Sequence, residues 1–336
     1  MRVLVTGATG FTGGHLAHAL AAAGHQVRAL VRKESDVVQA FRPAASGGPE
    51  GPHPQINFTV GDLRDTTALA VAVDAIEVVY NIAAIYRQAG LSADTYRAVN
   101  ATAVANLVEQ SARAGVRRVV HCSTVGVHGD IEHPPANEEA PLRPGDVYQR
   151  TKVEGEQRAR EAATRSGIEL TIARPSGIYG PGDRRLLKLF RNTIRRFPTL
   201  GRGEIYYHLT YIDDLVQGLR LCGEHPAAAN RTYILAGGEV TTLNEVVALI
   251  AGVAGVRPQP IHPPVWPFWL AGALCEAVCA PLGIEPPIYR RRIDFFTKSR
   301  AFDITRARTE IGFAPAIGLR EGITRTLTWY RDHGWL

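Results

Sequence analysis

The first thirteen residues constrain the fold of this chain most strongly. Val3, Leu4 and Val5 form a short apolar run that is typical of a strand buried on both faces, as in a parallel sheet. Glycines follow at positions 7, 10 and 13, and an Ala- and Leu-rich segment at 14–23 then predicts a helix. Glycines let the backbone approach a pyrophosphate closely, and a helix N-terminus offers it free N–H groups. The stretch therefore predicts a dinucleotide-binding turn, with an ordinary glycine-rich turn as the alternative.

The rest of the first half repeats this alternation of strand and helix. Further strands are expected at 26–31, 56–60, 78–82 and 117–122, and long helices at 96–114 and 148–166. The alternation up to about residue 175 predicts an α/β Rossmann-type fold, with a doubly wound parallel sheet. We assign residues 1–176 to this nucleotide-binding domain, with later returns near 205–240, and 177–336 mainly to a smaller mixed α/β C-terminal substrate domain. Residues 35–55 are rich in proline and glycine and are expected to form a flexible surface loop.

Composition narrows the class of protein. Four cysteines suggest no disulfide framework, which fits a reducing, cytoplasmic location. Cys275 and Cys279 are one helical turn apart, but without a second clustered pair we expect packing and no metal site. The net charge of +6 could suit nucleic acid, yet the basic residues are spread out and no recognition module is present, so no nucleic-acid partner is expected. We find no signal peptide and no apolar run long enough to predict a spanning segment.

Two residues four positions apart predict proton-transfer chemistry. Tyr148 and Lys152 share one face of the helix expected at 148–166. A phenol titrates at about 10, and a nearby cation favours its phenolate. Thr124, next to Ser123, follows the strand at 117–122, at the edge where open α/β sheets meet their ligands. We expect Thr124, Tyr148 and Lys152 to be catalytic, with a chance Tyr-x-x-x-Lys pair as the alternative.

The end of the second strand bears on coenzyme choice. An acidic residue there would bind the 2′-hydroxyl of NAD, but this chain has Val31 followed by Arg32. With a cation and no acid, a 2′-phosphate fits better, so NADP is favoured and NAD remains possible. A solvated surface arginine is the alternative interpretation of Arg32.

Several motifs together resemble the extended short-chain dehydrogenase/reductases. Residues 6–13 resemble their TGxxGxxG signature, residues 123–129 their Ser/Thr segment, and Tyr148 with Lys152 their YxxxK pair. The resemblance implies hydride transfer in which Tyr148 is the general acid or base, Thr124 hydrogen-bonds the substrate oxygen, and Lys152 lowers the tyrosine pKa and holds the ribose. The glycine-rich turn, the positions of residues at strand ends and the resemblance together predict which residues bind the coenzyme. They are Gly7, Thr9, Gly10, Phe11, Thr12, Gly13, Arg32, Asp62, Leu63, Ala83, Ala84, Tyr148, Lys152, Pro175, Gly177 and Ile178.

Departures from the family pattern point toward a substrate class. Gly177 stands where nucleotide-sugar enzymes usually have an Asn, and Tyr207 stands where they usually have an Arg. Both missing groups contact a diphosphate, whereas residues 174–183 look closest to 3β-hydroxysteroid dehydrogenase relatives and Arg32 to the dihydroflavonol reductase branch. We therefore expect an NAD(P)-dependent oxidoreductase of a small, fairly apolar hydroxy or keto compound, with a nucleotide-sugar epimerase/dehydratase as the alternative. Non-enzymatic relatives often lose the Tyr or Lys, which this chain keeps.

Two asparagines bear on the family pattern in other ways. Asn81 stands where the family often has His, a difference that stays uninterpreted, and Asn100 resembles the family's structural Asn.

Three features stay open from the sequence. Residues 263–283 are apolar and could form a lid, core packing or a contact with a membrane surface, with Arg290, Arg291 and Arg292 nearby for anionic lipid. The basic face of residues 184–196 could bind an acidic substrate, although a solvated face is the simpler interpretation. The resemblance implies a homodimer formed through the helices at 96–114 and 148–166.

Overall fold

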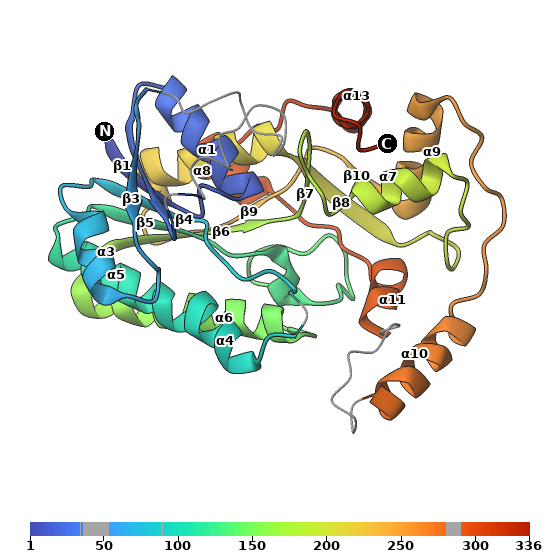
Figure 1. Ribbon diagram of the computed structural model, residues 1–336, viewed down its shortest axis with the longest axis horizontal. Coiled ribbons are helices and arrows are strands. Elements are labelled where there is room, and N and C mark those ends of the chain that lie inside the picture. The colour runs from blue at the N-terminus through green and yellow to red at the C-terminus, as the bar shows by residue number, and fades with distance from the viewer. Residues whose placement is uncertain (34, 36–53, 89, 280–289) are drawn as a thin grey trace.

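A seven-stranded parallel sheet forms the centre of the computed structural model, which describes residues 1–33, 35, 54–88, 90–279 and 290–336. Its strand order is β3-β2-β1-β4-β5-β6-β9, and each neighbouring pair is parallel. The expected doubly wound α/β sheet is thereby confirmed (Figure 1). The strands are β1 (Arg2–Thr6), β2 (Gln26–Val31), β3 (Ile56–Val60), β4 (Val78–Asn81), β5 (Arg118–Cys122), β6 (Glu169–Pro175) and β9 (Thr232–Leu235).

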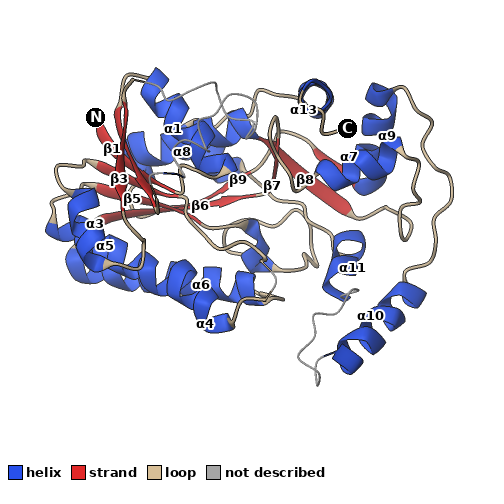
Figure 2. Ribbon diagram, in the orientation of Figure 1, coloured by secondary structure: helices blue, strands red, loops and turns tan. Residues whose placement is uncertain are grey.

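Helices cover both faces of this sheet (Figure 2). One face carries α1 (Phe11–Ala22) and α8 (Ile212–Glu224), and the other carries α3 (Thr66–Val73), α5 (Ala103–Arg113) and α6 (Val147–Ser166). The alternation of side chains along β1 divides the core between the two faces: Val3 and Val5 pack in one apolar cluster and Leu4 in the other. Because both faces are covered, the central strands β1, β4 and β5 are buried at nearly every position rather than at every second one.

Two helices begin or continue differently from the sequence expectation. Helix α1 begins at Phe11, so three residues of the glycine-rich stretch form its first turn, and the extended Gly10 precedes it. The helix expected at 96–114 is built from α4 (Ala93–Arg97), a π-helical turn (Ala98–Thr102) and α5. Helix α6 ends as predicted at Gly167, which has the left-handed φ of 75°. Most of the expected loop at 35–55 lies outside the described residues.

A smaller sheet and several helices follow β6. Strand β7 (Gly177–Tyr179) is parallel to β8 (Tyr206–Tyr211), and β10 (Val240–Thr242) is antiparallel to β8. Around them lie α7 (Leu187–Ile194), α9 (Leu243–Ala254) and α13 (Leu319–Asp332). Strand β9 returns to the large sheet from within the range where a return was expected, while the boundary at residue 176 stays a prediction.

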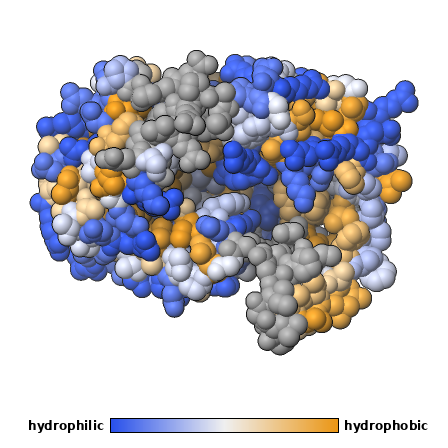
Figure 3. Space-filling view, viewed as in Figure 1, coloured by the Kyte–Doolittle hydropathy of each residue, from blue (hydrophilic) through white to orange (hydrophobic). Residues whose placement is uncertain are grey.

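Helix α10 (Trp266–Cys279) packs against α11 (Arg290–Thr297) and otherwise points away from the body of the protein (Figure 1). Its exposed residues are apolar, including Trp266 at 68% and Leu274 at 60% exposure. Figure 3 shows hydrophobic residues gathered over this part of the surface. Core packing, one of the three interpretations of this segment, does not describe most of its side chains. Within the described residues, no helix is long and apolar enough to cross a membrane.

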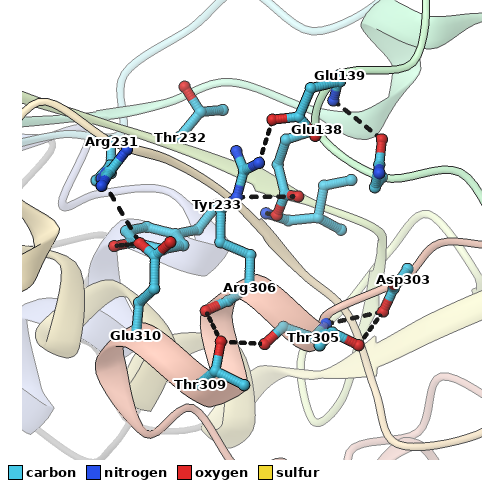
Figure 4. A network of polar contacts seen from close by, with 12 residues as sticks. Glu138, Glu139, Arg231, Thr232, Tyr233, Asp303, Thr305, Arg306, Thr309 and Glu310 are labelled. Carbon is cyan, nitrogen blue, oxygen red and sulfur yellow. Dashed lines mark hydrogen bonds and ion pairs between the residues drawn. The ribbon is translucent and has the colours of Figure 1, made fainter.

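Polar contacts fasten α12 (Thr305–Ile311) to the large sheet (Figure 4). Arg306 pairs with Glu138 and Glu139, which precede α6 in the chain. The Tyr233 hydroxyl of β9 donates to Glu310 at 2.9 Å. Glu138 also accepts from the Ile234 N–H of β9 at 2.8 Å, so these contacts hold the segment before α6 and α12 against the edge strand of the sheet.

Candidate functional site

A large cleft lies at the carboxyl ends of the central strands. Its volume is about 1290 Å³, and it extends from the glycine-rich turn to residues of α11 and the segment after it. Fifteen of the sixteen residues predicted to bind coenzyme line it, and so does Thr124. Lys152 is the exception. The cleft thus joins the predicted nucleotide end to the predicted reaction centre.

The glycine-rich turn forms a tight cradle at one end of the cleft. Gly7 has a φ of +72°, and a Cβ there would lie 2.8 Å from the backbone nitrogen of Ala83. A Cβ at Gly13 would collide with the carbonyl oxygen of Gly7. Gly7 therefore needs glycine for both conformation and space and Gly13 for space alone, and the cradle leaves the N-terminus of α1 facing the cleft. This arrangement fits a pyrophosphate group.

Two arginines flank Asp62 at the predicted adenosine end. The Asp62 carboxylate accepts three hydrogen bonds from Arg64, from its backbone N–H, Nε and Nη2, each at 2.8 Å. These bonds lower the pKa of Asp62 to about 2, with a smaller contribution from the charge of Arg32. Arg32 and Arg64 both line the cleft. Sequence reasoning missed Arg64, although its position two residues after Asp62 was a usable signal because it allows this local pairing.

The start of α6 places Tyr148 at the cleft. Asp146 caps the helix by accepting from the Gln149 N–H at 2.8 Å, and its other carboxylate oxygen pairs with Arg87 at 3.0 Å. Thr124 lines the same cleft, and its hydroxyl accepts from the Gly126 N–H at 3.0 Å. The hydroxyl proton of Thr124 is therefore available to an oxygen atom in the cleft.

The charges around Tyr148 differ from the expectation. Burial raises the pKa of Tyr148, and the cations that oppose this rise are Arg87 and Arg185 rather than Lys152. The ring of Tyr86 meets Tyr148 edge to face at 5.0 Å, and Arg87 lies over Tyr86. Sequence reasoning missed Tyr86 and Arg87, because nothing in their local pattern shows that the chain after β4 folds back over α6.

Lys152 lies beneath the cleft rather than in its wall. The side chain is 1% exposed, and its ammonium nitrogen lies 2.7 Å from the Cys122 carbonyl oxygen and 3.3 Å from Nε2 of His121. Burial lowers the pKa of Lys152 to about 8. The structure therefore places Tyr148 and Thr124 together at the cleft and Lys152 behind them. Asn100 bonds the backbone of Ile85 and the Thr151 hydroxyl, which supports the structural role implied for it.

The far end of the cleft explains one departure from the nucleotide-sugar pattern. A Cβ at Gly177 would lie 2.8 Å from Cδ2 of Leu209, so an asparagine there would require repacking. Apolar rings from Tyr207, Phe295 and Phe302 line this end. Cationic residues also line it, including Arg184, Arg185, Lys298 and Arg300. The basic run at 184–196 thus contributes its first two arginines to the cleft, where Arg185 pairs with Asp183 at 2.7 Å.

Comparison with known proteins places this site in a family context. Residues 3–236 match the model of the NAD dependent epimerase/dehydratase family. A 3β-hydroxysteroid dehydrogenase/Δ5→4-isomerase of Mycobacterium tuberculosis is 31% identical, over 98% of this chain and 90% of that protein. A dTDP-glucose 4,6-dehydratase of Streptomyces griseus is 28% identical, over 98% and 94%. The solved structure of MoeE5 in complex with UDP-glucuronic acid and NAD is similar with a TM-score of 0.75, at 27% identity over 99% of both chains.

Proposed function

Because the chain belongs to the NAD-dependent epimerase/dehydratase family, within the extended short-chain dehydrogenase/reductases, we propose that it transfers a hydride between NADP and a hydroxy or keto carbon of a small, fairly apolar compound. The observation that carries this proposal is the juxtaposition of Tyr148 and Thr124 in one cleft with a glycine cradle. The coenzyme supplies the hydride chemistry when bound. The cradle at Gly7–Gly13 would hold its pyrophosphate.

The side chains of this chain divide the remaining work. Tyr148 gives a proton to, or takes it from, the substrate oxygen, and Thr124 donates a hydrogen bond to the same oxygen. Arg87 and Arg185 favour the phenolate of Tyr148 against the effect of burial. Lys152 would hold the ribose, as the resemblance implies, and its donor to the Cys122 carbonyl at 2.7 Å leaves further N–H donors on the side chain.

We favour NADP because two arginines face the adenosine end. Arg32 directly follows β2, at the position where NAD enzymes have an acid nearby, and Arg64 lines the same cleft. Arg32 offers a guanidinium group suited to a 2′-phosphate, and Arg64, whose Nε and Nη2 already bond Asp62, adds its remaining N–H donors. Asp62 is already engaged by Arg64, so its carboxylate is less available to a ribose hydroxyl.

Gly177 and Tyr207 support the proposed substrate class. At the two positions where the resemblance assigns diphosphate-binding groups to nucleotide-sugar enzymes, this chain has a glycine close to Leu209 and a tyrosine that lines the cleft. The similarity to the mycobacterial hydroxysteroid dehydrogenase supports this choice. The alternative, a nucleotide-sugar epimerase or dehydratase, is supported by the similarity to the Streptomyces dehydratase.

One experiment separates these two functions. Purified protein is mixed with NADPH or NADH and a panel of apolar ketones and alcohols, and separately with UDP- and dTDP-sugars without added coenzyme. Net oxidation of NADPH in the first set supports the proposal. Conversion of a sugar nucleotide by protein that carries its own NAD, with no net coenzyme change, supports the alternative instead.

The setting of the enzyme is also proposed. All four cysteines are free thiols, which supports a reducing, cytoplasmic location. Helices α5 and α6 pack side by side on one face and would form the homodimer contact. The exposed apolar side of α10 supports peripheral contact with a membrane surface, since Trp and Phe are typical of helices that lie at such interfaces.

A further inference from the structure

A chain of buried hydrogen bonds connects Lys152 to the glycine-rich turn. Nζ of Lys152 lies 3.3 Å from Nε2 of His121, and Nδ1 of that ring lies 3.1 Å from the amide nitrogen of Asn81. The Thr6 hydroxyl donates to Oδ1 of Asn81 at 2.7 Å and accepts from the Ala83 N–H at 3.1 Å. The four side chains are 0–1% exposed. Three of them lie on β1, β4 and β5, which are adjacent in the sheet.

The backbone donor at one end and the need of each buried polar group for a partner together favour one direction along these bonds. A backbone N–H can only donate, so Oγ1 of Thr6 accepts from Ala83 and its own proton goes to Oδ1 of Asn81. The Asn81 amide group then faces His121 with its NH₂, and Nδ1 of the ring accepts. The opposite orientation of Asn81 would leave the Thr6 hydroxyl proton without an acceptor in this network, a costly arrangement for a buried group. The proton of the neutral His121 ring is therefore on Nε2, facing Lys152.

This direction favours one protonation state of the lysine. An Nε2–H directed at Nζ is attracted by the lone pair of a neutral amine and opposes an ammonium group. A neutral amine can accept from His121 and still donate to the Cys122 carbonyl. We propose that Thr6, Asn81 and His121 are positioning residues that hold Lys152 retracted under the cleft and favour its neutral amine. Asn81, which departs from the family pattern, is the central link.

Other titratable groups near Lys152 also act on its protonation. Burial is the main cause that lowers the pKa of Lys152, while Cys122 on β5 and Glu156 on α6 raise it. Glu156 is itself paired with Arg174 at 2.6 Å, which limits its pull. Burial is the largest cause that holds the pKa of His121 well below its usual range, so the ring stays neutral.

The composition of the chain makes a direct measurement practical. The sequence contains four lysines, so protein labelled with ¹³C at the lysine ε-carbons gives four signals, and Lys152→Met identifies the relevant one. Its titration yields the pKa without substrate or coenzyme. A long-range ¹H–¹⁵N spectrum of the histidine rings reports which nitrogen of His121 carries the proton, with His121→Gln for assignment.

Variants of Thr6 change the network of hydrogen bonds at the end opposite Lys152. Thr6→Val removes the hydroxyl that orients Asn81, and Thr6→Ser keeps it. We expect the Nε2–H tautomer in the wild type, a Lys152 pKa raised by about half to one unit in Thr6→Val, and little change in Thr6→Ser. A proton on Nδ1 of His121, or equal Lys152 pKa values in the two Thr6 variants, overturns the proposal. If Thr6→Val does not fold, the wild-type tautomer still decides. Because neither measurement involves turnover, failure here is distinct from failure of the proposed function.

Discussion

At the scale of single residues, the proposed reaction depends on two side chains that line the cleft. Tyr148 carries the proton transfer proposed for the reaction, and Thr124 shares its side of the cavity. In the absence of a general acid–base group, catalysis falls by about 10²–10⁴. We therefore expect Tyr148→Phe to lose at least a hundredfold in kcat while keeping its coenzyme affinity, as measured by NADPH oxidation and by fluorescence titration.

The matched control is Tyr80→Phe. The Tyr80 hydroxyl is buried without a hydrogen-bond partner among the described residues, on a different part of the sheet. Removing it should leave turnover within about twofold, because a buried hydroxyl without a partner contributes little. Equal rates for wild type and Tyr148→Phe would remove Tyr148 from the mechanism.

Arg32 and Arg64 should set coenzyme preference. A hydrogen bond to a charged group is worth about 1.5–3 kcal/mol, which corresponds to roughly tenfold or more in affinity. Arg32→Ala is expected to raise the KM for NADPH about tenfold and to leave that for NADH nearly unchanged. Lys33→Ala, which removes the neighbouring charge, serves as the control. If Arg32→Ala raised the KM for NADPH and the KM for NADH by the same factor, Arg32 would not be the residue that binds the 2′-phosphate.

At the scale of helices and strands, the position of a site residue depends on local sequence patterns and on contacts with residues distant in the sequence. Only the local patterns could be predicted from the sequence. The apolar run, the glycines and the Ala-rich segment predicted β1 and α1 because strand, turn and helix signals are local. The retraction of Lys152 depends on His121 and Asn81, which come from neighbouring strands, so spacing along α6 gave no sign of it. Arg87 was not predicted as a site residue for the same reason, because its partner Asp146 is distant in the sequence.

The N-terminus of α6 offers a test at the scale of an element. Asp146 caps the helix and pairs with Arg87. Asp146→Asn keeps a capping oxygen but loses the charge, whereas Asp146→Ala loses both. We expect Asp146→Ala to be about 1 kcal/mol less stable to urea than Asp146→Asn, because the lost cap costs about that much. Equal stability of the two variants would mean that the cap does not hold α6 in place.

Across the whole molecule, buried Lys152 should make stability depend on pH. Its pKa of about 8 in the folded state lies below the unfolded value of about 10.4, so between these values the unfolded chain binds more protons. The free energy of unfolding should therefore rise from pH 8 to 10, by about 2 kcal/mol from this group. Lys152→Met should lack that part of the rise when urea curves are compared at each pH. Parallel curves for the two proteins would contradict the lowered pKa.

The exposed side of α10 has consequences for the molecule as a whole. Six large apolar residues are exposed there, and the chain carries a net charge of +6. We expect the protein to sediment with vesicles of phosphatidylcholine and phosphatidylglycerol, and less with phosphatidylcholine alone. Leu274→Glu should weaken this binding, whereas Val71→Glu on the distant α3 should not. Concentration-dependent self-association that Leu274→Glu abolishes, without vesicle binding, would assign α10 to a contact between copies instead.

The central claim is that one cleft seats a coenzyme with its reactive end at Tyr148, and a crystal structure with NADPH tests it most directly. The account predicts the pyrophosphate on the turn at Gly7, Gly10 and Gly13, the 2′-phosphate between Arg32 and Arg64, and the nicotinamide ring beside the Tyr148 hydroxyl. A nicotinamide ring outside this cleft, or one separated from Tyr148 by protein, would contradict it.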